Sequence, residues 1–305
     1  MAEITAALVK ELREKTGAGM MECKKALSET GGDLEGAIDF LRKKGLSVAE
    51  KKAGRIASQG LVGVVVEGNK GAIVELNSET DFVARNAEFQ AMLSKMLGAA
   101  LATNGDVEAM KNETADGKTM ADTLTELIAK IGENMSLRRA AAVSVENGVV
   151  VPYMHTAVVP NQGKIGVLVA LESTADKGAL ADLGKKIAMH IAASSPRFLS
   201  VQDVDADTLA HEKSIYEEQA KASGKPANII EKMVEGRIRK FHEEVVLLEQ
   251  AFIMDPDKKI KDVVAAAAKE LGTDVQLTSY VRFALGEGLE KKNEDFAAEV
   301  ASCMK

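Results

Sequence analysis

Aromatic residues are scarce in this chain: they make up 4% of its 305 residues, and tryptophan is absent. Hydrophobic residues nevertheless reach 46%, so alanine, leucine, valine and isoleucine must build the cores. Cores of this kind favour amphipathic helices over an all-β sandwich. The length indicates two or more packed units rather than one.

Cysteine is also scarce, since the chain has only Cys23 and Cys303, which lie near opposite ends. This excludes a disulfide framework and a cysteine-based metal site. No histidine lies within four residues of another, so the spacing of a histidine metal site is absent as well. The histidines are His155, His190, His211 and His242. We predict neither a metal ion nor a cofactor in this chain.

A basic stripe is missing too. The net charge is −7, and the short basic runs at 42–44 and 51–52 lie in acid-rich surroundings, as at a solvated helix end or linker. We therefore predict no nucleic-acid partner. The acidity and the short apolar runs also predict no contact with a membrane. Because Met1 leads straight into a helical pattern, without the regions of a signal peptide, we predict a cytoplasmic protein.

Motifs of enzymatic chemistry are absent. Gly117-Lys118-Thr119 resembles the end of a phosphate-binding loop, but Asn112 stands where that motif requires its first glycine. The chain has no Gly-x-Ser-x-Gly elbow, and its paired acids fall in helical charge runs. We predict that the protein is not an enzyme.

The first 55 residues are typical of three short helices. Thr5 and Asp33 are suited to cap the first and third helices, and glycine-containing breaks at 16–19 and 31–32 separate them. Small three-helix modules with so little core usually bind other proteins. We expect a polar connector over residues 46–59.

A change to β-rich sequence follows. Two runs flank Gly68-Asn69 and predict a hairpin over residues 61–77. A long helix comes next, and the pattern predicts that one apolar face contains Phe89, Leu93, Met96, Leu97 and Ala100. Residues 103–118 are polar and contain glycine, which predicts a loop, and another helix begins near Met120.

A second β-and-helix unit begins near residue 137. Strands are expected at 140–145, 149–158 and 164–171, with Asn147-Gly148 as a hairpin turn, and a helix at 176–193. Residues 71–76 and 166–171 resemble each other, and each leads into a helix. This indicates a weak internal repeat, although chance similarity of two β-rich runs is an equal alternative.

The last third of the chain is mostly helical. Residues 205–249 form two charged stretches around a turn, with a nearly heptad apolar stripe in the second, which predicts an antiparallel helical hairpin. A helix is expected at 261–271, a strand at 275–285 that rejoins the second unit's sheet, and a terminal helix at 293–302. The fold class is therefore α+β.

The segment Thr80, Asp81, Phe82 and Val83, called the tip below, lies between a strand and a helix. Thr80 or Asp81 is suited to cap that helix, and Phe82 is suited to fill the core between strand and helix. From the residues alone, these structural interpretations are favoured over a functional site.

The chain as a whole resembles bacterial translation elongation factor Ts. Segments that resemble the family occur in the same order along almost the whole length. They are residues 2–6, 9–13, 16–27, 80–84, 130–134, 190–194 and 232–237. Several ordered segments that match together make a chance resemblance negligible.

The resemblance implies a division of the chain. It implies a ubiquitin-associated-like (UBA-like) three-helix module and a two-part α/β core with antiparallel sheets and packed helices. An inserted coiled-coil hairpin and a C-terminal helical module complete the fold. In order, the parts are residues 1–55, the core N-subdomain 56–136, the core C-subdomain 137–204 with 250–288, the hairpin 205–249 and the terminal module 289–305.

The resemblance also implies a function and a partner. The family binds elongation factor Tu, a GTPase, and speeds the release of its GDP during translation elongation. The resemblance implies that two residues of the tip, Asp81 and Phe82, act on the partner, and that Phe82 enters the GTPase domain. The tip would thereby displace a magnesium ion that belongs to the partner, while this chain binds none.

Two further contact regions follow from the resemblance. The residues Arg13, Met20, Met21 and Lys24, called the N-terminal surface below, match the family's amino-terminal contact surface. His155 matches a histidine near the end of the core. Residues 103–118 and 144–163 look longer than the family pattern, which makes the placement of His155 less direct than that of Phe82.

Two alternatives remain open at this point. In the first alternative, the chain is a scaffold or holdase that assembles partners through residues 205–249, and Phe82 is only a core residue. Family members also differ in whether this hairpin mediates dimerisation, so dimerisation through it stays open.

Overall fold

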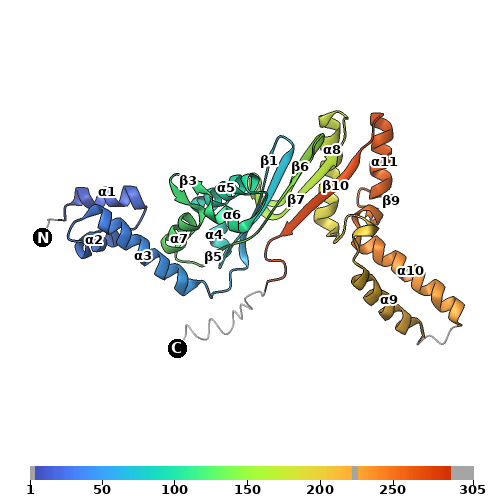
Figure 1. Cartoon of the computed structure of the whole chain (residues 1–305), viewed down its shortest axis with the longest axis horizontal. Helices are drawn as coiled ribbons and strands as arrows, with labels where there is room; N and C mark the ends of the chain where they lie inside the picture. Colours follow the sequence, from blue (N-terminus) through green and yellow to red (C-terminus); the bar gives the residue numbers. More distant parts are fainter. Residues whose placement is uncertain (1–3, 222–225, 290–305) are drawn as a thin grey trace.

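The chain folds as helices packed on antiparallel strands, and the computed structural model describes residues 4–221 and 226–289. The predicted α+β class is confirmed. Figure 1 shows the N-terminal helices at one end of the long axis, the sheet in the middle and two antiparallel helices at the other end. Within the described ranges, no helix is both long and apolar enough to cross a bilayer.

The N-terminal helices enclose a small core of their own. They are α1 (Ala6–Thr16), α2 (Met20–Glu29) and α3 (Leu34–Lys52). The Thr5 side chain accepts a hydrogen bond from Leu8 N–H, and the Asp33 carboxylate accepts from Glu35 and Gly36 N–H, so both predicted caps are confirmed. The buried side chains are Val9, Leu12, Cys23, Ala26, Leu27 and Ala37.

The polar connector predicted over residues 46–59 is wrong in its first half, because α3 continues to Lys52. Alanine, glutamate and lysine are good helix formers, and no breaker interrupts them there. Packing also favours the helix: Ala49 contacts the core, and the buried Gly45 lies close to Ala129 of α7. Only residues 53–58 connect α3 to the first strand.

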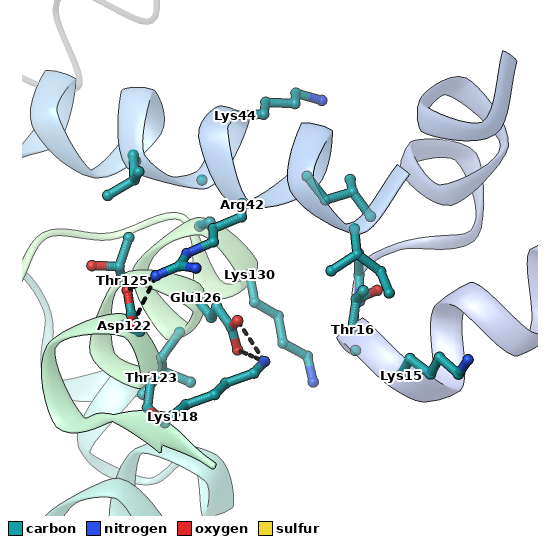
Figure 2. Close-up of a pocket in the computed structure, with 18 of the residues that line it drawn as sticks. Lys15, Thr16, Arg42, Lys44, Lys118, Asp122, Thr123, Thr125, Glu126 and Lys130 are labelled. Carbon is teal, nitrogen blue, oxygen red and sulfur yellow. Dashed lines mark hydrogen bonds and ion pairs between the residues drawn. The ribbon is translucent and has the colours of Figure 1, made fainter. Parts of the chain in front are cut away.

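A cavity of about 1240 Å³ lies between the N-terminal helices and α7 (Met120–Ile131), as Figure 2 shows. Arg42 of α3 forms an ion pair with Asp122 of α7 across it, with an N–O distance of 3.0 Å. The four lysines labelled in Figure 2 are also paired with carboxylates. These pairs are Lys118–Glu126, Lys130–Glu88, Lys44–Glu22 and Lys15–Glu11. Each of the five cations labelled in Figure 2 thus forms an ion pair within the chain.

The first half of the sheet contains a hairpin and a third strand. The strands are β1 (Gln59–Glu67), β2 (Lys70–Ser78) and β5 (Met135–Ser144). β1 and β2 pair around Gly68-Asn69, which confirms the predicted hairpin, and β2 also pairs with β5. Helices α4 (Asp81–Ala84) and α5 (Ala87–Ala102) follow β2. The predicted apolar face of α5 is buried in the core against these strands, including Phe89 with no exposed surface.

The loop predicted over residues 103–118 is wrong, because this segment contains α6 (Val107–Asn112) and the short strands β3 (Thr114–Ala115) and β4 (Lys118–Thr119). The Asp106 carboxylate caps α6 by accepting from Glu108 and Ala109 N–H. Met110 is completely buried. Because only one turn and a half of helix is present, its single buried side chain leaves little periodicity in the sequence.

The second half of the sheet repeats this arrangement. Its strands are β6 (Gly148–Val159), β7 (Gln162–Glu172) and β10 (Gln276–Ala284), and its helices are α8 (Lys177–Ser194) and α11 (Ile260–Leu271). β6 pairs with β7, a helix follows, and the later strand β10 pairs with β7. β1, β2 and β5 have the same connectivity, so the topology supports the repeat and confirms that the strand at 275–285 rejoins the second half.

The two halves meet in one six-stranded sheet among the described residues. The junction between β1 and β7 is short: Val62 lies opposite Gly163, and Gly63 lies opposite Gln162. The Gln162 side chain donates hydrogen bonds to the Gln90 carbonyl and the Ser94 hydroxyl of α5. The junction therefore depends on side chains as well as on the strand ladder.

The hairpin turn predicted at Asn147-Gly148 is wrong, because β5 and β6 are not partners. The segment instead carries the chain from one half of the sheet to the other. Gly148 has a φ of +149°, and a β-carbon at this position would lie 2.0 Å from the Leu171 carbonyl oxygen. The glycine therefore reflects close backbone contact with β7, and the dipeptide alone does not distinguish this from a turn.

The predicted helical hairpin is confirmed by α9 (Ala206–Lys221) and α10 (Ala227–Val245), which lie side by side in Figure 1. Short 3₁₀ turns, η1 (Val201–Asp203) and η2 (Leu247–Glu249), flank it, and the strands β8 (Ala251–Phe252) and β9 (Asp255–Lys259) follow. Phe241 and Val246 are buried at its base. The predicted terminal helix at 293–302 lies outside the described residues.

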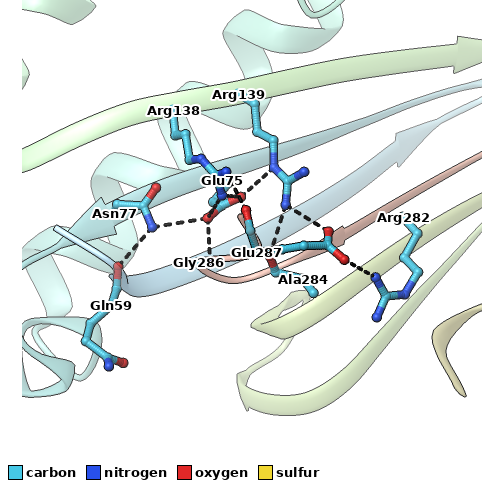
Figure 3. A network of polar contacts seen from close by, with 9 residues as sticks. All are labelled: Gln59, Glu75, Asn77, Arg138, Arg139, Arg282, Ala284, Gly286 and Glu287. Atoms are coloured by element: carbon cyan, nitrogen blue, oxygen red, sulfur yellow. Dashed lines mark hydrogen bonds and ion pairs between the residues drawn. The ribbon is translucent and has the colours of Figure 1, made fainter. Parts of the chain in front are cut away.

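Glu75 lies in the middle of β2 and has no exposed surface. Its carboxylate accepts hydrogen bonds from Arg138 and Arg139 of β5 and from the Gly286 amide, which follows β10 (Figure 3). Arg139 also donates to the Ala284 carbonyl. Burial alone would raise the pKa of Glu75, but the Gly286 amide and Arg139 outweigh it, and the pKa lies below the ordinary glutamate value.

We expect Glu75→Gln to destabilise the fold by about 3 kcal/mol at neutral pH, because it leaves two arginines facing an uncharged amide. A lowered pKa in the folded state contributes stability above the ordinary value of about 4.3 and loses it as the pH falls through the folded-state value. The stability difference between wild type and variant should therefore shrink in acid. Thermal unfolding at pH 7 and at about pH 3.5 measures it.

The control is Glu67→Gln, which removes the same charge from an exposed position of β1 and should change the free energy of unfolding by less than about 0.5 kcal/mol. An equal difference for Glu75→Gln at both pH values would contradict the role of its charge.

Candidate functional site

The tip consists of Thr80, at the N-cap position of α4, and the first three of the four residues of that helix. Phe82 is 79% exposed and Asp81 is exposed, whereas Val83 and Ala84 are buried against the core. The interpretation of Phe82 as a core residue is therefore wrong. A large aromatic side chain held in solvent between two buried segments is typical of a protein-binding site.

Local chemistry explains why the chain exposes these two residues. β2 is buried up to Ser78, and Asn86 caps α5 by accepting from Glu88 and Phe89 N–H. The end of the strand and the start of the long helix are thus both fixed in place. The four residues of α4 form the connection between them. Val83 occupies the inner side of this crossing, which leaves Phe82 on the outer side.

The prediction that Thr80 or Asp81 caps the long helix is wrong, because Asn86 caps α5 and the short helix α4 intervenes. Thr80 occupies the N-cap position of α4, but its side chain makes no capping hydrogen bond. Its hydroxyl and its amide instead donate to the Glu133 carboxylate, over 2.7 and 3.0 Å. Glu133 had no predicted role, because its only signal in the sequence is its place in the family-like run 130–134. Its contact with Thr80 joins positions 53 residues apart, which no local pattern reveals.

The N-terminal surface lies on α1 and α2. Met20 and Met21, 60% and 75% exposed, occupy the first turn of α2, and Lys24 and Arg13 are also exposed. Gly17 ends α1 with a φ of +68°, and its amide donates to the Arg13 carbonyl. This sharp reversal leads into α2, so the two methionines begin a helix instead of entering the small core.

The structure does not bring the predicted residues together in one place. Figure 1 shows α2 and α4 well apart along the long axis, and β6, which carries His155, lies beyond α4. His155 is exposed, and its Nδ1 lies 3.2 Å from the Tyr153 hydroxyl. Separate exposed contacts spread along an elongated molecule are compatible with a large partner and not with one catalytic pocket.

The remaining polar residues do not form a reactive cluster. His190 is completely buried, and its Nε2 lies 2.8 Å from the Gln250 side-chain oxygen. Burial lowers the pKa of His190, which keeps the ring neutral. Lys118 pairs with Glu126 and the Thr119 hydroxyl caps α7, as Figure 2 illustrates for the ion pair. In residues 4–221 and 226–289, no His, Cys, Asp and Glu side chains are grouped to hold a metal ion.

Comparison with known proteins gives consistent matches. A family model described as "Elongation factor TS" matches residues 79–287. Elongation factor Ts of Rhodospirillum rubrum is 60% identical over 308 residues, which covers 100% of both chains. The proteins of the same name from Rhodospirillum centenum and Caulobacter vibrioides are 60% and 58% identical, over 99% of this chain and 99% and 98% of their own. The family model begins just before the tip, and the relatives extend the match over the N-terminal surface.

We expect Phe82→Ala to change the free energy of unfolding by less than about 0.5 kcal/mol, because the side chain contributes little to the core. Phe89→Ala removes the same atoms seven residues later from a completely buried position, and it should cost about 3–5 kcal/mol. Chemical denaturation of both variants measures the contrast. A cost of several kcal/mol for Phe82→Ala would contradict the exposed tip.

Proposed function

The chain belongs to the elongation factor Ts family, and from this we propose that it is a guanine-nucleotide exchange factor for elongation factor Tu in translation elongation. The observation that carries the proposal is the exposed Phe82 at the tip. The scaffold or holdase alternative required this side chain in the core, and its exposure removes that support.

The mechanism we propose begins with insertion of Phe82 into the GTPase domain of the partner. Burying a phenylalanine contributes roughly 1.5–3 kcal/mol, and aromatic anchors often dominate an interface. Asp81 stands beside it and brings a negative charge toward the phosphate site. The tip then displaces the partner's magnesium ion and disturbs the site of the β-phosphate. No bond is made or broken by this chain, so it accelerates exchange without being an enzyme in the chemical sense.

The coupling between this protein and the nucleotide must be reciprocal. A factor that weakens GDP binding is itself bound less tightly when a nucleotide is present, by the same free energy. Entry of GTP into the complex therefore favours release of the factor. This allows one molecule of the factor to act on many molecules of the partner.

Other parts of the chain supply binding without displacing the nucleotide. We assign the N-terminal surface, with its two exposed methionines, and His155 on β6 to this role. The exposed methionines suit an apolar contact, because their flexible side chains adapt to a partner surface. Dimerisation of the complex through residues 205–249 belongs to the same proposal as a secondary contact.

The family also supports a division of the chain and a location. We propose a UBA-like module at residues 1–55, two core subdomains, the hairpin at 205–249 and a terminal module at 289–305. The expected boundary between the core subdomains at 136 and 137 is moved to the segment between β5 and β6, because β5 pairs with β2 of the first half. We place the protein in the cytoplasm, without direct nucleic-acid or membrane partners.

Release of a fluorescent GDP analogue from elongation factor Tu tests the function. Wild-type protein should accelerate release strongly, and Phe82→Ala should reduce the maximal stimulated rate by roughly tenfold or more, because the anchor is lost. Ile253→Ala, which shortens an exposed aliphatic side chain between β8 and β9, outside every contact proposed here, should retain the wild-type rate. A folded Phe82→Ala variant with the full rate would refute the role of the tip.

The N-terminal surface should affect a different parameter. We expect the double substitution Met20→Ala and Met21→Ala to raise the concentration of factor needed for half-maximal release by about fivefold or more. The maximal rate should change little, because the tip is intact. The same titration measures both values, and a lower maximal rate with an unchanged half-maximal concentration would contradict the assignment.

A further inference from the structure

Two loops next to the tip hold each other through reciprocal hydrogen bonds. The Glu133 carboxylate accepts from the Thr80 amide at 3.0 Å and from the Thr80 hydroxyl at 2.7 Å. In the other direction, the Glu79 carboxylate accepts from the Asn134 amide at 2.6 Å. We call Glu79, Thr80, Glu133 and Asn134 the carboxylate clasp. Hydrogen bonds to a charged carboxylate are stronger than those between neutral groups.

The amide, the hydroxyl and the carbonyl of Thr80 each have a hydrogen-bond partner. Its amide and hydroxyl donate to Glu133, and its carbonyl accepts from the Ser78 hydroxyl at 2.9 Å. Because the hydroxyl is directed to Glu133, it is not used to cap α4, although Thr80 occupies the N-cap position. The fold therefore forgoes an ordinary helix cap here in favour of a long-range contact.

The loop that carries Glu133 is itself anchored from behind. The Asn134 side chain donates to the Arg55 carbonyl at 2.8 Å and to the Ala53 carbonyl at 3.4 Å. The Lys52 ammonium donates to the Gly132 carbonyl. These contacts tie the loop to the end of α3, so the Glu133 carboxylate is a fixed point that does not simply follow Thr80.

The opposite side of the tip is anchored as well. Val83 and Ala84 are buried, and the Gln90 side chain donates to the Ala84 carbonyl at 2.9 Å. Only Asp81 and Phe82 stand free between the two anchors, with Thr80 on one side and Val83 on the other. A segment held in this way loses little conformational entropy when it binds.

We propose that Glu133 is a positioning residue for the tip: through Thr80 it holds Asp81 and Phe82 in the conformation that enters the partner. This inference rests on the proposed function, since it assigns Glu133 to the same site. Glu133 does not itself contact the partner's nucleotide. It acts by restricting α4 before the encounter, so its loss should reduce the productive fraction of bound complexes rather than the binding itself.

Glu133→Gln tests the proposal because it keeps the size of the side chain. An amide has one acceptor oxygen, so it cannot accept from both the amide and the hydroxyl of Thr80 through separate oxygens. Thr80→Val removes only the hydroxyl. Glu126→Gln is the matched control: it removes the same charge on α7, from a carboxylate that pairs with Lys118 at the surface.

The first measurement is stimulated release of labelled GDP from elongation factor Tu as a function of factor concentration. Glu133→Gln should lower the maximal rate about five- to tenfold and change the half-maximal concentration less than about twofold, because the N-terminal surface is intact. Thr80→Val should have a smaller effect, and the double variant should match Glu133→Gln alone, because Glu133 acts through Thr80. Glu126→Gln should match wild type.

The second measurement is amide hydrogen exchange of the free chain, which does not depend on the partner. In Glu133→Gln, the amides of residues 80–85 should exchange at least about tenfold faster, and those in the middle of α5 should be unchanged. Faster exchange throughout the chain would instead mean general destabilisation, and that result would overturn the positioning role.

The outcomes separate this inference from the proposed function. If wild type does not accelerate GDP release, the function fails, and hydrogen exchange still decides whether Glu133 restrains the tip. If wild type is active and Phe82→Ala is not, but Glu133→Gln keeps the full maximal rate and unchanged exchange at residues 80–85, the positioning role is refuted while the function stands. Additive effects of Glu133→Gln and Thr80→Val would likewise refute action through Thr80.

Discussion

The charge of the buried Glu75 carboxylate must be compensated by other groups inside the protein. The groups that do so hold the two halves of the sheet together. The β1–β7 ladder between the halves is short. Arg138 and Arg139 approach Glu75 from β5, and the Gly286 amide approaches from the segment after β10. Arg139 also donates to the Ala284 carbonyl and pairs with Glu287 after β10, so hydrogen bonds and an ion pair connect the two halves in addition to the ladder.

The tip depends on this arrangement because it continues directly from the same strand. Glu75 and Ser78 lie three residues apart on β2, and Thr80 follows the end of the strand. A strand fixed at its centre provides a rigid base, and the carboxylate clasp fixes the next two residues. The exposed phenylalanine is thus the end of a supported series of contacts, although α4 by itself is too short to be a stable helix.

Local patterns predicted most of the secondary structure. The caps at Thr5 and Asp33, the hairpin at Gly68-Asn69 and the apolar face of α5 depend on neighbours within a few residues, and each is confirmed. The errors have the opposite origin. Asn147-Gly148 has the composition of a hairpin turn, but strand pairing elsewhere in the sheet makes it part of the connection between the two halves. Helix α3 is longer than predicted because it packs on α7.

The residues of the chain alone indicate the α+β class and the order of its longer helices and strands, and the ordered family-like segments indicate the candidate site residues. The sequence left the status of Phe82 open, because an aromatic residue between a strand and a helix fits a core as well as a surface. Only the tertiary structure decided that Val83 is buried and Phe82 exposed, and that Thr80 binds Glu133 instead of capping α4. The physical reason is that burial and long-range hydrogen bonds depend on which distant segments meet, and that information is not local in the chain.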